Sequence, residues 1–257
     1  MRFGFPHACE PNFCDISLNS VARATKRVMC ATGIITLLVG LTFILSQQNL
    51  PAADAPPASR PADNWQSLFD GKTLGKWKAS DFAGHGEPEV EDGNLLLPFG
   101  ETLTGITYTG EVPRISYEIE VEAKKIDGSD FFCGLTFPVN DSYASLICGG
   151  WGGAVVGISS LDGKDAARNE TRTVRKFDRE KWYTIRLRVL PDRLQAWVDG
   201  EKIVDVVTTG KKISTRVEVD ASKPLGISSF QTTAALRKIR IRTLKASEIP
   251  AATAPGK

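Results

Sequence analysis

The chain has 257 residues, of which 42% are hydrophobic, enough for a sizeable core. Its 32 lysines and arginines nearly balance its 30 aspartates and glutamates, so we expect no nucleic-acid partner, and a neutral ligand fits at least as well as an anionic one. With only two histidines, His7 and His85, a Ser/His/Asp hydrolase would depend on His85, and a zinc site lacks its usual ligands. Any metal would be held by oxygen ligands. We predict neither a metal nor a cofactor.

The amino-terminal segment has the composition of a targeting sequence. The basic stretch 23–27 (RATKR) precedes an uncharged apolar run at 28–45, and small residues follow around Ala53–Ala55. This order is typical of a secretory signal, and the run is also long enough to remain as a membrane anchor. We predict that residues 1–55 are a signal peptide or an N-terminal membrane anchor and that 56–63 form a Pro/Ala-rich linker. The chain is then exported, and is periplasmic, secreted or anchored through 28–45.

Short strand patterns follow one another from Trp65 onward, separated by Gly, Pro, Asn and Asp. Their spacing of about ten residues is typical of a sandwich or barrel, and no window predicts a long amphipathic helix. The predicted strands are 94–99, 115–123, 131–137, 143–151, 155–160, 182–190, 193–199, 202–208, 214–220, 225–230 and 236–244. We predict an all-β fold, a jelly-roll β-sandwich of two antiparallel sheets over residues 64–246, with a flexible tail at 247–257.

Alternation within these segments predicts which faces are buried. Three glutamates of 115–123 lie on one face of the predicted strand. The opposite face carries its apolar residues: Ile115, Tyr117, Ile119, Val121 and Ala123. In 182–190 and 236–244 the face opposite the apolar residues is largely basic. These patterns predict acidic outward rows on one sheet and basic rows on the other. Asp199-Gly200 predicts a two-residue hairpin.

The two cysteines outside the leader straddle a turn pattern at 138–141 (PVND). A hairpin symmetric about Asn140-Asp141 would place Cys133 opposite Cys148, close enough for a cross-strand disulfide in an oxidising compartment. The alternative is two small buried residues with free thiols.

A glycine-rich stretch at 149–164 (GGWGGAVVGISSLDGK) suggests a phosphate-binding loop, but its spacing excludes one. Five residues, rather than four, separate Gly157 from Gly163, and Asp165 follows Lys164 where a Ser or Thr is needed. Glycines within a strand also mark a place where another surface approaches the backbone. Trp151 between two glycine pairs is therefore either an accessible platform for a sugar ring or a core residue whose crowding the glycines relieve.

Carboxylates are the remaining candidates for chemistry, because glycoside cleavage normally uses Asp and Glu. Glu118 shares a strand face with two further glutamates, and these like charges could raise one pKa as an acid/base role requires. Asp130, Glu170 and Glu218 are further candidates on strands or adjoining loops. For each of them, a solvated strand face is the alternative.

Several segments resemble the 3-keto-disaccharide hydrolase domain family. WQSLFDGKTLGKW at 65–77 is similar to the family's opening motif, and VEDGNLLL at 90–97 to its next strand. REKWYTIRLRVLPDRLQAWVDGEKIVDV at 179–206 and RKIRIRTL at 237–244 resemble later segments. The stretch FCGLTFPVNDSYASLICGGWGGAVVG departs from the family's usual G-G-N-S-G-I pattern.

The resemblance implies a concanavalin A-like sandwich that cleaves 3-keto-glycosides, with a carbohydrate as substrate. The C3 ketone acidifies the C2 proton, so a base can start elimination of the C1 leaving group, and water then adds. We predict Glu118 or Glu170 as acid/base and Arg216 or Arg172 as enolate stabiliser. Trp151, Asn169 and Glu218 complete the predicted sugar-binding residues. The alternatives are a non-catalytic, lectin-like carbohydrate-binding module and a purely structural sandwich.

Overall fold

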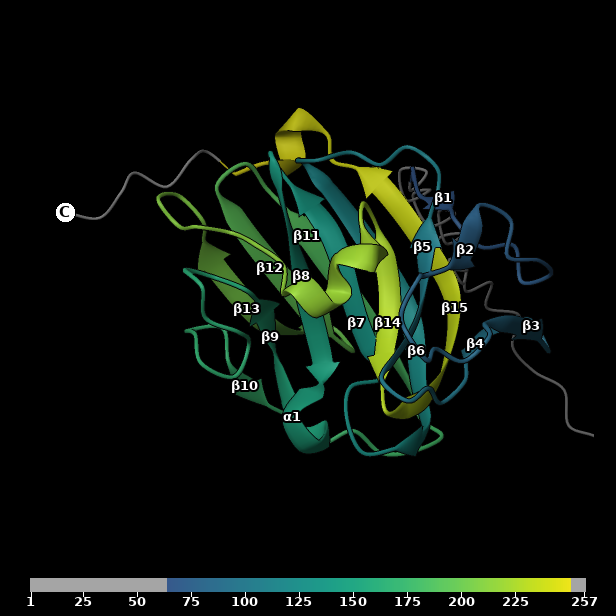
Figure 1. Cartoon of the computed structure of the whole chain (residues 1–257). Coiled ribbons are helices and arrows are strands. Elements are labelled where there is room, and N and C mark those ends of the chain that lie inside the picture. The colour runs from purple at the N-terminus through teal and green to yellow at the C-terminus, as the bar shows by residue number, and fades with distance from the viewer. Residues whose placement is uncertain (1–63, 251–257) are drawn as a thin grey trace, which may run out of the picture. The chain divides into compact units, whose positions relative to one another are not determined.

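A computed structural model of the chain describes residues 64–250, which form two antiparallel sheets packed face to face (Figure 1). Sheet A has the order β13-β12-β11-β6-β15-β4-β3, with β1 also paired to β15, and sheet B has the order β10-β9-β8-β7-β14-β5-β2. The strands of sheet A are β1 Gln66–Ser67, β3 Glu89–Glu91, β4 Asn94–Leu97, β6 Tyr117–Gly128, β11 Trp182–Val189, β12 Arg193–Val198, β13 Glu201–Val207 and β15 Thr232–Thr243. Those of sheet B are β2 Trp77–Ala79, β5 Leu103–Tyr108, β7 Cys133–Val139, β8 Ser142–Gly149, β9 Val155–Ser159, β10 Thr173–Val174 and β14 Gly226–Phe230. The predicted all-β, jelly-roll-like sandwich is confirmed.

The core lies between the sheets and follows the predicted alternation. In β6 the side chains at alternate positions are buried in one hydrophobic cluster: Tyr117, Ile119, Val121 and Ala123. Sheet B adds the inward residues of its central strands: Leu135, Phe137, Leu146, Ile158 and Ile227. Burying each large apolar side chain stabilises the fold by about 1.5–3 kcal/mol. Ile115, predicted on the same face, precedes β6 and is exposed.

Both predicted hairpins are confirmed. Asp199 and Gly200 join β12 to β13 with φ values of 52° and 82°, as a type I′ turn requires. The β7–β8 pair is symmetric about Asn140 and Asp141, since Val139 lies opposite Ser142. Local turn chemistry fixes the register of both pairs.

Cys133 lies opposite Cys148 in this hairpin, as predicted from the symmetry. In this structure the second alternative is observed, because both residues are buried free thiols in the main core. Burial raises the pKa of the Cys133 thiol to about 12 and that of Cys148 well above its usual value. Both thiols are therefore protonated and packed as small apolar side chains.

The outer face of sheet A carries the acidic and basic rows together. The glutamates of β6 lie between the arginines of β11 and β15, with Glu118 opposite Arg188 on one side and Arg242 on the other. The prediction that the two rows belong to different sheets is therefore wrong. The strand order places opposite charges side by side, which favours pairing of β6 with both neighbours.

Residues 214–220 do not form the predicted strand. They cross the outer face of sheet B and end in a 3₁₀ helix, η1 (Val217–Ser222), which contacts β5 and β14 (Figure 1). Ser214 exchanges two backbone hydrogen bonds with Ser160, and within η1 the bonds are local, with Val219 N donating to Arg216 O at 3.2 Å. The alternation of valines with charged residues does not reflect a strand here, because Val219 is buried while Val217 is 79% exposed.

The predicted signal or anchor at 1–55, the linker at 56–63 and most of the tail at 247–257 lie outside the described residues. Within 64–250, no helix has the length and apolar character needed to cross a membrane. A second short 3₁₀ helix, η2 (Ala246–Glu248), follows β15.

Candidate functional site

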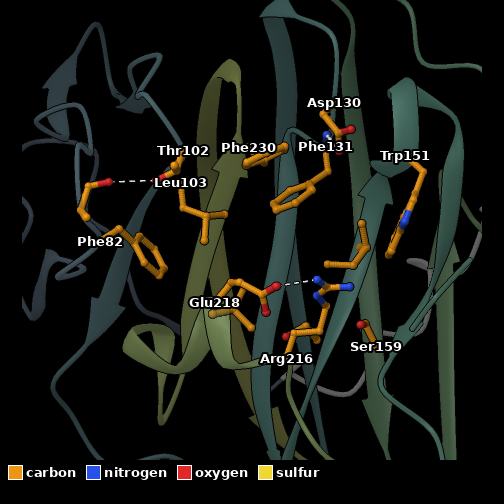
Figure 2. Close-up of a pocket in the computed structure, with 14 residues that line it drawn as sticks. Phe82, Thr102, Leu103, Asp130, Phe131, Trp151, Ser159, Arg216, Glu218 and Phe230 are labelled. Atoms are coloured by element: carbon orange, nitrogen blue, oxygen red, sulfur yellow. Dashed lines mark hydrogen bonds and ion pairs between the residues drawn. The ribbon is translucent and has the colours of Figure 1, made fainter. Parts of the chain in front are cut away.

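A cavity of about 500 Å³ opens on the outer face of sheet B (Figure 2). Its lining comes from β5, β8, β9 and β14, from η1 and from the turn between β8 and β9. The sequence brings these elements together only through the strand order of the sheet. The cavity has a floor of sheet residues, an aromatic wall, the Trp151 turn and an arginine–glutamate pair.

The floor of the cavity consists of small side chains in cross-strand register. Ser159 on β9 lies opposite Ser145 on β8, which lies opposite Thr136 on β7 and then Gly226 on β14. Ser145 and Ser159 line the cavity, and the hydroxyls of Ser145 and Thr136 are 2.8 Å apart. Because alternate residues of a strand share a face, Leu146 points into the core while its neighbours Ser145 and Ile147 line the cavity.

One side of the cavity is an aromatic wall, made by Phe82, Leu103, Phe131 and Phe230. With Val219 these residues form a hydrophobic cluster separate from the main core. The rings of Phe131 and Phe230 stack with their centroids 6.0 Å apart. Phe82 lies against Gly105 and Phe131 against Gly134, where an added Cβ would come within 3.0 and 2.9 Å of the rings, respectively. Glycine on the strands thus allows the rings to lie against the sheet.

The glycine-rich stretch forms a tight turn rather than the predicted strand. β8 ends at Gly149, and the turn α1 (Gly150–Gly153) holds Trp151, Gly152 and Gly153 at φ values of 50°, 86° and 99°. Glycines are needed here because side chains rarely adopt this left-handed conformation. Trp151 is 42% exposed and lines the cavity, so of the two alternatives the accessible ring is confirmed.

Asp130 fixes this turn from the neighbouring loop. Its Oδ2 accepts a hydrogen bond from Gly152 N at 3.0 Å, and its Oδ1 accepts one from Phe131 N at 2.8 Å. Asp130 also lines the cavity. Since both oxygens bind backbone N–H groups, its carboxylate positions Trp151 and Phe131 relative to each other.

Arg216 and Glu218 face the cavity as an ion pair (Figure 2). Arg216 Nη2 lies 2.5 Å from Glu218 Oε1, and its Nη1 lies 3.4 Å from Oδ2 of the buried Asp165. The hydrogen bond from Arg216 lowers the pKa of Glu218, and the same bond raises the pKa of Arg216. The pair is therefore a carboxylate beside a guanidinium at neutral pH.

Two predicted catalytic residues lie away from this cavity. Glu118 is fully buried on the outer side of sheet A, where its oxygens accept from Arg188 Nε at 2.6 Å and from Arg242 Nε at 2.7 Å. Glu170 lies in the β9–β10 connection, outside the cavity lining, with Lys211 Nζ 2.6 Å from its carboxylate. The hydrogen bond from Lys211 lowers the pKa of Glu170. Glu118 and Glu170 therefore belong to separate ion pairs on different faces.

Asn169 and Arg172 flank Glu170 and also lie outside the lining. The amide of Asn169 is buried and donates to the carbonyls of Ile158, Lys164 and Asp165, so it holds the loop together. Arg172 is exposed. Of the predicted sugar-binding residues, the structure brings together Trp151, Arg216 and Glu218.

The aromatic wall was not predicted from the sequence. Phe131 and Phe132 are adjacent in the predicted strand 131–137, where neighbouring side chains point to opposite faces; in the structure they lie directly before β7. Phe132 is fully buried in the core, which leaves Phe131 for the outer face. This adjacency was the available signal; the contributions of Phe82 and Phe230 depend on strand pairing over long sequence distances.

Among residues 64–250, no group of three His, Cys, Asp or Glu side chains is arranged to hold a metal ion. His85 Nδ1 lies 2.9 Å from Gly86 O, and His85 does not line the cavity. Of the other polar residues that line the cavity, Asp130 and Thr102 bind backbone groups, which leaves the serines of the floor and the Arg216–Glu218 pair to face a ligand.

Comparison with known proteins identifies the family to which this sandwich belongs. The sequence pattern of a family described as the 3-keto-alpha-glucoside-1,2-lyase-like domain matches residues 64–242. The chain belongs to this family. The match spans the sandwich and confirms the resemblance of its opening motif and later strands. No curated protein sequence matches the chain.

Solved structures share the fold of this lyase-like domain at low identity. The Crh5 transglycosylase in complex with NAG is 12% identical, with a TM-score of 0.50 over 72% of this chain and 86% of that chain. A carbohydrate-binding module, CBM66 from Bacillus subtilis, is 13% identical over 68% and 99% of the two chains, with a TM-score of 0.45. A putative glycosyl hydrolase from Parabacteroides distasonis is 14% identical over 71% and 94%, with a TM-score of 0.45. At these identities the likeness concerns the fold alone.

Proposed function

We propose that the cavity binds a sugar ring carrying a ketone at C3 and that Glu218 and Arg216 cleave its glycosidic bond by elimination. The observation that carries the proposal is the Arg216–Glu218 pair, which faces a largely apolar cavity beside the exposed Trp151. Membership of the 3-keto-alpha-glucoside-1,2-lyase-like family supports the choice of substrate. The proposal transfers the base from Glu118 or Glu170 to Glu218.

The reaction needs a base beside the C2 proton and a positively charged group beside the oxygen of the adjacent C3 ketone. Glu218 takes the proton from C2, and the electrons of that C–H bond form the enolate of the C3 ketone, whose oxygen accepts hydrogen bonds from Arg216. The enolate then forms the C1=C2 double bond, the C1–O bond breaks, and the leaving oxygen takes a proton from water. The hydroxide left by that water would then add to C1 and Glu218 would return its proton to C2, which gives net hydrolysis and regenerates the carboxylate.

The geometry of the pair suits this division of roles. C2–H and the C3 carbonyl are adjacent on a sugar ring, and the carboxylate and guanidinium lie 2.5 Å apart. Glu218 is ionised at neutral pH and can accept a proton; the hydrogen bond from Arg216 that lowers its pKa also makes it a weaker base until the guanidinium turns to the substrate oxygen. Asp165 orients the guanidinium from behind at 3.4 Å. A sugar ring stacked on Trp151 would present one edge to the pair, and the serine hydroxyls of the floor would meet its hydroxyls.

The proposal is tested by mixing the purified chain with 3-keto-trehalose or 3-keto-sucrose and measuring released glucose or fructose. We expect turnover by the wild type and by Glu170→Gln, the matched control, because Glu170 is an ion-paired glutamate outside the cavity. Glu218→Gln should lose about 10²–10⁴-fold in kcat, the range for removing a general base. Full turnover by Glu218→Gln would overturn the assignment.

A non-catalytic sugar-binding role is the second candidate. The observation in its favour is that Asp130, the other carboxylate lining the cavity, has both oxygens engaged by backbone N–H groups. Among the described residues that line the cavity, this leaves Glu218 as the carboxylate available for proton transfer. Glycan-array binding that Trp151→Ala abolishes, without turnover of any 3-keto-glycoside, would favour this role.

We further propose that the domain acts after export, on the basis of the basic, apolar and small-residue order in 1–55. Fractionation of the producing cells and N-terminal sequencing of the recovered chain test this proposal. Recovery in the cytoplasm with Met1 retained would contradict it.

A further inference from the structure

The cavity has two chemically different halves (Figure 2). The half towards β8 and β9 holds the serines of the floor, Trp151 and Arg216, together with Ile147 on β8 and with Asp130, which binds the Trp151 turn. The half towards β14 and β5 holds the aromatic wall and Val219. Among the described residues lining this second half, the only polar side chain is Thr102, and its hydroxyl donates to Ala83 O at 2.8 Å. Glu218 reaches toward Arg216 from η1, at the boundary between the halves.

The cavity is long enough for a ligand with two parts. Its lining runs from Ser159 on β9 to Leu103 on β5, and these strands are separated by β8, β7 and β14. Four spacings between neighbouring strands amount to about 19 Å. A single sugar ring covers little more than one spacing. A glycoside whose sugar lies beside Trp151 and Arg216 therefore extends its second group onto the aromatic wall.

The wall is a poor surface for a second sugar. One face of a sugar can stack on a phenyl ring, but the hydroxyls around its edge would meet Leu103, Val219 and the remaining rings. Each hydroxyl left without a partner in such a place weakens binding by about tenfold. An apolar ring of similar size has no such groups and gains from burial against the same side chains.

We propose that the cavity selects glycosides whose second group is an apolar ring, aromatic or alicyclic, rather than a second sugar. This inference rests on the proposed function for the first ring, the 3-keto sugar held by Arg216 and Glu218. The aromatic wall is then the subsite for the leaving group, and Phe82 and Phe230 determine specificity there.

The test compares cyclohexyl α-glucoside with trehalose, first as ligands and then as their 3-keto forms. A cyclohexyl alcohol is no better a leaving group than a sugar hydroxyl, so a preference for it in turnover comes from binding. We expect the Kd by calorimetry and the KM for the cyclohexyl compounds to be lower by about tenfold or more. Phe230→Ser and Phe82→Ser should each reduce the preference to about threefold or less. Phe99→Ser, at an exposed phenylalanine outside the lining, should leave it unchanged.

The outcomes separate the inference from the proposed function. Tighter binding of cyclohexyl α-glucoside without turnover of either 3-keto compound would support the apolar subsite and contradict the catalytic role. Equal or better binding of trehalose, with turnover, would overturn the subsite and leave the catalytic role standing. Binding of neither compound would overturn the inference. If one wall variant fails to fold, the other still measures the preference.

Discussion

Glu118→Gln tests whether this glutamate stabilises the fold or takes part in chemistry. Glu118 is fully buried on sheet A, and its two oxygens accept from the guanidinium groups of Arg188 and Arg242. Glutamine has nearly the same shape but carries an N–H group where one oxygen was. One guanidinium would therefore face another donor instead of an acceptor.

The magnitude follows from these contacts. Breaking a buried ion pair by removing one partner costs about 3–5 kcal/mol. Arg242 keeps a second partner, since its Nη1 lies 2.8 Å from Glu248 Oε1, and the side chain of Arg188 is 24% exposed to solvent. The glutamine also keeps one acceptor oxygen. We therefore expect Glu118→Gln to lower the free energy of unfolding by about 2–3 kcal/mol.

Urea unfolding at pH 7 measures the effect, with Glu120→Gln as the matched control. Glu120 lies on the same strand face and pairs with Arg240, whose side chain is 41% exposed, so its variant should lose only about 1 kcal/mol. Turnover or sugar binding per folded molecule should be unchanged in both variants. A loss below about 0.5 kcal/mol for Glu118→Gln would refute the structural role. A Glu118→Gln protein that is folded but inactive would show that Glu118 takes part in catalysis.

Three further predictions concern ionisable groups. The pKa of Asp205 is about 2, because hydrogen bonds from three side chains outweigh the opposing effect of burial; its stabilisation is present above pH 3.8 and lost as the pH falls toward about 2. Asp205→Asn should therefore lower the free energy of unfolding by about 1–2 kcal/mol at pH 7 in urea titrations, and a gap that does not narrow below pH 4 would contradict this. Arg216→Gln should raise the pKa of Glu218 toward its usual value of 4.5, so the acidic limb of kcat/KM should move to higher pH; an unmoved limb would count against the pairing. Cys133 and Cys148, whose thiol pKa values are raised by burial, should react with a thiol reagent at pH 8 only in denaturant, and rapid labelling of either residue in the native protein, located by peptide mapping, would disprove their burial.

The sequence predicts features whose cause is local. Asp199-Gly200 and Asn140-Asp141 specify their hairpins through turn chemistry, and the alternation in 117–123 specifies which face of β6 enters the core. The family motif in 65–77 identified the domain because turn and core patterns are carried by the fold itself.

Features that depend on long-range pairing were predicted poorly. Glu118 resembled a catalytic acid because the arginines that neutralise it, Arg188 and Arg242, come from strands 70 and 124 residues later. Residues 214–220 alternate as a strand does, yet the segment crosses sheet B and ends in the 3₁₀ helix η1. That crossing is what brings Arg216 and Glu218 over the cavity, so a mispredicted element carries the candidate catalytic pair.

The central claim is that Glu218 removes the proton from C2 of a 3-keto sugar. It is tested most directly with 1,5-anhydro-3-keto-glucitol, which has no leaving group at C1, by following exchange of its C2 proton in deuterated water by NMR. The account predicts catalysed exchange at C2 by the wild type and by Glu170→Gln, and exchange at the uncatalysed rate with Glu218→Gln. Catalysed exchange that survives in Glu218→Gln, or its absence in the wild type, would contradict the account.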